Sequence, residues 1–122
     1  MKKKGLLVGG GIAIMLLVMF LSGCKPILLP AVTAIKNSDN TIKVSWNTIL
    51  SATSYNVYIS TNNVAYNLEP SLSGATTTTV TFRPTVVNTY WFKVSAVNSN
   101  GEGPQSLATL PITIDTLPTP AP

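Results

Sequence analysis

The residue with the clearest chemical potential is Cys24, the only cysteine in the 122-residue chain. A thiolate is a strong nucleophile, so this side chain is a candidate for covalent modification. A single cysteine excludes an intrachain disulfide, and because the chain has no histidine, a cysteine–histidine metal site cannot be built. The absence of histidine also removes the most common general base of enzymes.

The acidic side chains do not form a catalytic pattern. The four that the chain contains are Asp39, Glu69, Glu102 and Asp115. They fall in turns or near strand ends, far apart in sequence, whereas a glycosidase needs two carboxyl groups close together in space. Gly101-x-Gly103 is not a phosphate loop, because no helix is expected after it. We therefore interpret the acids as solvated turn residues and predict no catalytic residue, no metal, no cofactor and no enzymatic activity.

The first 23 residues have the organisation of a secretory signal. Three lysines at positions 2–4 precede an uncharged apolar run over 5–21, and the small residues Ser22 and Gly23 follow. The alternative is an uncleaved membrane helix, because the run is near the lower limit of about 17–25 residues for a membrane span. Either reading keeps the positive N-terminus in the cytoplasm.

The tetrapeptide Leu21-Ser22-Gly23-Cys24 resembles the lipobox of bacterial lipoproteins. The resemblance implies cleavage before Cys24, a diacylglyceryl group on its sulfur and often a further acyl chain, such as palmitate, on the new amino terminus. Two acyl chains are enough for stable anchoring, so we expect the membrane to be a partner through Cys24. Lys25 stands where enterobacterial lipoproteins of the inner membrane carry aspartate. We therefore expect the exported side of a bacterial cell membrane, or the outer membrane where the host has one.

The positive net charge of +4 belongs mainly to the leader. From Lys25 onward the chain has five basic and four acidic side chains, which leaves a charge of +1. The basic residues of this part are scattered, whereas nucleic-acid binding requires clustered Lys and Arg. The sequence therefore predicts no nucleic-acid partner.

Residues 30–115 carry the pattern of a β-sandwich, in which short stretches of alternating hydrophobicity are separated by turn residues. The expected strands are residues 31–35, 41–46, 54–60, 65–68, 77–82, 89–98 and 106–114. Asn98-Ser99-Asn100-Gly101 predicts a hairpin turn, and Pro111 is typical of an edge strand. Residues 24–29 are expected to be a short linker, and the Pro-rich tail 116–122 is expected to be extended.

Five motifs within residues 30–114 resemble the fibronectin type III family. They are Ile42-Lys43-Val44-Ser45-Trp46, Tyr55-Asn56-Val57-Tyr58, Phe82-Arg83-Pro84, the strand Tyr90-Trp91-Phe92-Lys93-Val94-Ser95-Ala96-Val97-Asn98, and Gly101-Glu102-Gly103-Pro104-Gln105-Ser106. The resemblance implies an all-β, immunoglobulin-like sandwich of seven strands, with Trp46 in the core. It also implies that the Tyr90 hydroxyl bonds to backbone in the preceding loop. Phe82 departs from the usual leucine, and the loop from Pro84 to Tyr90 is about two residues longer than usual.

Two aromatic side chains are candidates for ligand binding. If Tyr55 and Tyr90 face the core, then Tyr58 and Trp91 face outward. The family resemblance makes their strands antiparallel neighbours, so we expect Tyr58 and Trp91 to lie near each other. Such a pair can stack on a sugar or anchor a protein contact. The alternative is an ordinary stabilising cross-strand pair.

The sequence as a whole predicts a membrane-anchored lipoprotein whose single fibronectin type III-like domain is a protein-binding or spacer module in the cell envelope. An envelope protein or a glycan is the expected partner. One alternative is a carbohydrate- or adhesin-type ligand binder that uses Tyr58 and Trp91. Another is a non-catalytic subunit of an envelope enzyme or secretion assembly.

Overall fold

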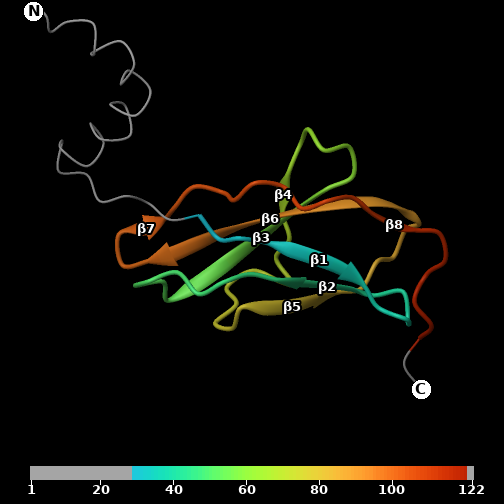
Figure 1. Ribbon diagram of the computed structural model, residues 1–122, viewed down its shortest axis with the longest axis horizontal. Coiled ribbons are helices and arrows are strands. Elements are labelled where there is room, and N and C mark those ends of the chain that lie inside the picture. Colours follow the sequence, from blue (N-terminus) through green and yellow to red (C-terminus); the bar gives the residue numbers. More distant parts are fainter. Residues whose placement is uncertain (1–28, 121–122) are drawn as a thin grey trace, which may run out of the picture.

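The computed structural model describes residues 29–120, and every regular element in this part is a β-strand (Figure 1). The predicted signal 1–23, Cys24 and most of the linker lie outside the described residues. The strands are β1 (Thr33–Lys36), β2 (Ile42–Ser45), β3 (Ser54–Ser60), β4 (Asn67–Leu68), β5 (Thr79–Phe82), β6 (Asn88–Asn98), β7 (Gly101–Glu102) and β8 (Ile112–Ile114). Residues 29–120 contain no helix that is long and apolar enough to cross a membrane.

Two antiparallel sheets face each other across one core. The first has the order β1-β2-β5. The second places β3 between β4 and β6, and both β7 and β8 pair with the other edge of β6. Each sheet buries one face and leaves the other toward solvent, which explains the alternating sequence pattern. The predicted all-β sandwich is thus confirmed.

The strand predictions are most accurate where the alternation is longest. The prediction of 54–60 matches β3, and the prediction of 89–98 is one residue shorter than β6. The predicted strand 106–114 is wrong over most of its length, because only Ile112–Ile114 is regular. The expected hairpin turn is confirmed: Asn98 pairs with Gly101, whose φ of 122° favours glycine.

The segment between β7 and β8 follows β6 without forming a regular ladder. Ser106 N–H donates to the Val94 carbonyl (2.8 Å), while the Ser106 Oγ accepts the Val94 N–H (2.9 Å). Likewise, the Thr109 N–H donates to the Phe92 carbonyl (2.9 Å), and the Thr109 hydroxyl oxygen accepts the Phe92 N–H (3.1 Å). The two hydroxyl groups therefore replace the backbone carbonyls that a regular strand would offer, and they satisfy buried donors of β6. β7, this segment and β8 together occupy the place of the expected seventh strand.

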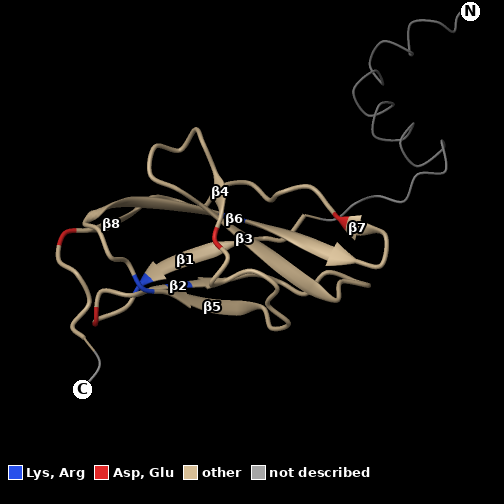
Figure 2. Cartoon of the chain, turned by 180° about the vertical axis from the view of Figure 1, so that it is seen from behind, with Lys and Arg blue, Asp and Glu red and all other residues tan. Residues whose placement is uncertain are grey.

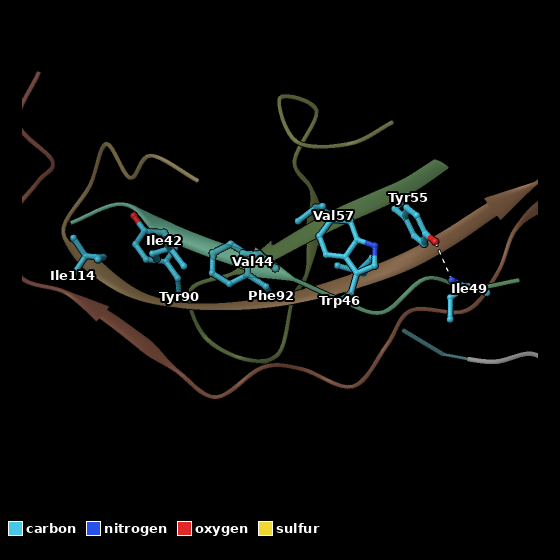
Figure 3. Close-up of a cluster of buried hydrophobic side chains, with 10 residues drawn as sticks. Ile42, Val44, Trp46, Ile49, Tyr55, Val57, Tyr90, Phe92 and Ile114 are labelled. Carbon is cyan, nitrogen blue, oxygen red and sulfur yellow. Dashed lines mark hydrogen bonds between the residues drawn. The ribbon is translucent and has the colours of Figure 1, made fainter. Parts of the chain in front are cut away.

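The core lies between the two sheets and is aromatic at its centre (Figure 3). Trp46 is only 6% exposed, which confirms its predicted core position. Its ring centroid lies 5.4 Å from that of Tyr55, at an interplanar angle of 60°. Phe82 makes edge-on contacts with Tyr90 and Phe92, so it fills the space where the family pattern has leucine.

The Tyr90 hydroxyl donates a hydrogen bond to the Val86 carbonyl in the loop between β5 and β6. This contact confirms the predicted bond from Tyr90 to the preceding loop, despite the extra loop length. Burial raises the pKa of Tyr90 and so favours the neutral hydroxyl, which is the form that donates this bond. The bond fixes the crossover from one sheet to the other.

Candidate functional site

The outward face of the β3–β6 pair carries both predicted ligand-binding residues. Tyr58 lies opposite Lys93 in the ladder, and Trp91 lies opposite Ser60. Tyr58 and Trp91 are therefore diagonal neighbours on one face, with Lys93 beside Trp91 along the strand. Diagonal neighbours on a sheet are about 7–8 Å apart, within reach of aromatic side chains. Both side chains are half-buried.

A third aromatic residue joins this face from outside the two strands. Tyr66, in the loop before β4, lies under the Lys93 ammonium, with Nζ 4.3 Å from the ring centroid. The Tyr66 hydroxyl donates to Asn63 Oδ1 (2.6 Å), which fixes the ring from its other end. A cation over a tyrosine ring is stabilised by the ring quadrupole. We refer to Tyr58, Tyr66, Trp91 and Lys93 together as the outer aromatic face.

Glu102 of β7 extends this face toward the β6–β7 hairpin. Its carboxylate accepts hydrogen bonds from the Ser95 and Tyr58 hydroxyls. These bonds hold the pKa of Glu102 below its ordinary value, and the bond from Ser95 has the largest effect. The hydrogen bond to Glu102 in turn raises the pKa of Tyr58. The hairpin is thus held against the centre of the sheet by a charge-assisted contact.

The other acids have the local roles expected of turn residues. The Asp39 carboxylate accepts hydrogen bonds from the Thr41 side chain and backbone, which lower the pKa of Asp39. Glu69 accepts hydrogen bonds from the Ser71 backbone N–H and hydroxyl. Asp115 pairs with Lys36 at 3.8 Å. Within residues 29–120 no group of three or more acidic or cysteine side chains is placed to hold a metal ion.

The charges are distributed unevenly along the sandwich (Figure 2). Lys36 and Asp115 form their ion pair at the end where the described chain finishes, and Asp39 lies in the turn after β1 at that same end. The opposite end carries Glu102 in β7. The outer aromatic face lies along the side that joins these two ends, on β3, β6 and the loop before β4.

Sequence reasoning found two members of this face and missed the others. Alternation placed Tyr58 and Trp91, and the same alternation puts Lys93 on the outer side of β6. Tyr66 had no such signal, because it precedes a strand of two residues and is placed by loop conformation. Glu102 was interpreted as a freely solvated turn acid. The structure corrects this interpretation, because the exposed carboxylate has two hydroxyl partners.

Comparison with solved structures identifies similar folds. A fibronectin type III-like protein from Clostridium thermocellum is 28% identical and superposes with a TM-score of 0.62, covering 70% of this chain and 91% of that one. Domains FN1–FN3 of chicken CNTN1 are 22% identical (TM-score 0.59), covering 75% of this chain and 32% of theirs. Pectate lyase Pel3 from Pectobacterium carotovorum is 21% identical (TM-score 0.56), with 66% and 26% covered.

No protein-family model matches the sequence. No curated protein matches it either. The fold of the similar Clostridium thermocellum protein is nevertheless the one that the motifs around Trp46, Tyr90 and Gly101 predict. The described part of the chain is therefore an immunoglobulin-like β-sandwich of the fibronectin type III type.

Proposed function

We propose that this chain is a bacterial lipoprotein, anchored through a diacylglyceryl group on Cys24, whose single domain is a protein-binding or spacer module on the exported side of the membrane. The observation that carries the proposal is Leu21-Ser22-Gly23-Cys24, which stands directly after a basic start and an apolar run. Cleavage before Cys24 would leave its sulfur as the lipid attachment point of the mature protein.

The arrangement of the domain supports a spacer role. The first described residues lie at one end of the sandwich and the last lie at the opposite end (Figure 1). A chain that enters at one end and leaves at the other holds whatever follows it away from the membrane. Five residue steps separate Cys24 from Leu29, and each spans at most about 3.4 Å, so the domain starts within roughly 17 Å of the lipid.

The similar structures support a module as well. In chicken CNTN1 and in the pectate lyase, the matching part is a fraction of a longer chain. Modules of this fold host many unrelated functions, so the role must come from surfaces and tethers rather than from the fold alone.

The anchor is tested by separating membrane and soluble fractions of cells that express the full chain. We expect the wild-type protein in the membrane fraction and the Cys24→Ser variant to lose its acyl label, because a serine hydroxyl does not replace the thiolate nucleophile. Ser22→Ala is the matched control, since it keeps a small residue before the cleavage site and should be processed normally. Unchanged acylation of Cys24→Ser would refute the proposal.

A second candidate function is ligand binding by the outer aromatic face. The observation that favours it is the presence of three half-buried aromatic rings and one ammonium group on a single sheet face. Aromatic rings stack on the apolar faces of sugars and anchor protein contacts. The test is a glycan-array and envelope pull-down comparison of wild-type protein with Trp91→Ala and Tyr58→Ala. Binding that is unchanged in folded variants would remove this candidate.

A further inference from the structure

We propose that the end of the sandwich that carries the β2–β3 loop rests on the bilayer surface, with Leu50 entering the lipid. This inference rests on the proposed lipid anchor at Cys24. It names the surface that the tethered domain turns toward the membrane, which the anchor alone does not determine.

The β2–β3 loop lies beside the point where the described chain begins. Asn47, in this loop, accepts a hydrogen bond from the Ala31 backbone N–H through its Oδ1. Leu29, two residues before Ala31, is 42% exposed. The β6–β7 hairpin lies at this end too, because the Thr53 N–H donates to the Val97 carbonyl at 2.7 Å (Figure 1). A tether that ends at Leu29 therefore holds these loops nearest the bilayer.

Leu50 is presented by a rigid turn rather than by a loose loop. The Ala52 N–H donates to the Ile49 carbonyl (3.0 Å), and Ser51 takes a positive φ of 71° inside the turn. Ile49 is buried, and its N–H donates to the Tyr55 hydroxyl at 3.0 Å (Figure 3). Leu50, at the tip, is 85% exposed. The loop thus fixes one apolar side chain in the core and holds its neighbour out in solvent.

The charge distribution favours a lipid surface at this end. Three loops contribute to it: residues 46–53, residues 74–78 and the hairpin around residues 97–103. Glu102 is the only ionisable side chain in these loops, and its carboxylate is bound by Ser95 and Tyr58. The other side chains of these loops can therefore approach low dielectric without desolvation of a charge, provided that Glu102 stays at the aqueous surface. The ion pair of Lys36 with Asp115 lies at the far end.

One exposed leucine contributes only modest affinity for a bilayer by itself, but the lipid tether keeps it close to the bilayer. An anchor within a few residues makes the contact intramolecular, so a weak apolar interaction is enough to bias orientation. A partner protein that covers Leu50 is the alternative occupant, and the experiment distinguishes it because purified vesicles contain no such partner.

The experiment uses the full lipidated protein in vesicles of phosphatidylethanolamine and phosphatidylglycerol. Cys24 is the only cysteine, and lipidation would block its sulfur. An introduced cysteine therefore carries the only free thiol. We compare Leu50→Cys with Val64→Cys, each labelled with an environment-sensitive fluorophore. Val64 is the matched control, because it is 82% exposed but lies in the β3–β4 loop, away from the tethered end.

We expect iodide in the aqueous phase to quench the label at position 50 several-fold less than the label at position 64. We expect a lipid-bound nitroxide to quench the label at position 50 more than the label at position 64. Equal quenching at both positions in a protein of confirmed acyl mass would overturn the docking while leaving the lipid anchor intact. An N-terminal peptide without acyl mass would overturn the proposed function itself, and the docking with it.

A second measurement tests Leu50 directly, with the reporter placed elsewhere at the same end. Ser99→Cys puts the fluorophore in the exposed turn of the β6–β7 hairpin. Leu50→Asp should restore aqueous quenching of this label to the level seen without vesicles, because a carboxylate is costly to place in lipid, while Val64→Asp should leave it unchanged. Equal quenching with and without Leu50→Asp would contradict a role for Leu50.

Discussion

The two faces of the β3–β6 pair are built from alternate residues of the same strands, yet they differ in burial and in the contacts that they make. On the inner face Val57, Phe92 and Val94 are fully buried. On the outer face Tyr58, Trp91 and Lys93 are half-buried; Tyr58 contacts Glu102 of β7, and Lys93 lies over Tyr66 of the loop before β4. The inner face is determined by packing between the sheets, whereas no second sheet of the described residues packs on the outer face. Function in this domain is therefore to be sought on the outer face and at the ends.

The largest expected contrast is between the two tryptophans. Trp46→Ala should lower the free energy of unfolding by about 3–5 kcal/mol, because it leaves a cavity between the sheets. Trp91→Ala should lower it by about 1 kcal/mol or less, the range of cross-strand surface pairs. Urea denaturation followed by circular dichroism measures both. A loss below about 1 kcal/mol for Trp46→Ala would contradict its place in the core.

The next contrast concerns hydroxyl groups on the edge of β6. Thr109→Val keeps the shape of the side chain but removes the acceptor of the buried Phe92 N–H. An unsatisfied buried donor costs about 1–3 kcal/mol. Thr113→Val is the matched control, because Thr113 is exposed and its hydroxyl meets only that of Thr89. Similar stabilities of the two variants in urea would show that the irregular segment does not depend on this hydroxyl.

A smaller effect is expected at the crossover between the sheets. Tyr90→Phe removes the hydrogen bond to the Val86 carbonyl while preserving the ring that packs on Phe82. The net loss of one such bond is about 0.5–1.5 kcal/mol. Tyr66→Phe provides a control on the outer face, since its hydroxyl bonds only an exposed Asn63. A larger loss for Tyr66→Phe than for Tyr90→Phe would reverse the proposed order.

The smallest effect is a pH dependence on the outer face. The folded state holds the pKa of Glu102 below its ordinary value of 4.5. The resulting stabilisation is present above that value and is lost as pH falls through the folded pKa. The advantage of wild type over Glu102→Gln in thermal melts should therefore shrink between about pH 5 and pH 3. An advantage that does not change over this interval would show that the carboxylate gains nothing from Ser95 and Tyr58.

The sequence predicts the inner face better than the outer one for a physical reason. Burial imposes a two-residue period on β3 and β6, so Tyr55, Val57, Phe92 and Val94 could be placed from alternation alone. No comparable constraint acts on the segment after β7. There, the side-chain hydroxyls of Ser106 and Thr109 accept hydrogen bonds that backbone carbonyls would otherwise accept. A pattern of hydrophobicity does not indicate such an exchange of side-chain for backbone acceptors.

The outer face was predictable only in part. Alternation gives the side on which Tyr58 and Trp91 lie. Their diagonal arrangement depends on the register of the whole ladder, in which Tyr58 pairs with Lys93 rather than with Trp91. Tyr66 reaches the face from a loop whose conformation includes a positive φ of 59° at Asn63. Glu102 reaches it through a two-residue strand. Loop geometry of this kind follows from tertiary packing rather than from local sequence.

The central claim is that a lipid on Cys24 holds this sandwich against a membrane, and the mass of the N-terminal peptide tests it most directly. The mature protein is isolated from native envelope, digested and measured by mass spectrometry. We predict a peptide that begins at Cys24 and carries at least a diacylglyceryl group. A peptide that retains residues before Cys24, or one that begins at Cys24 with an unmodified thiol, would contradict the claim.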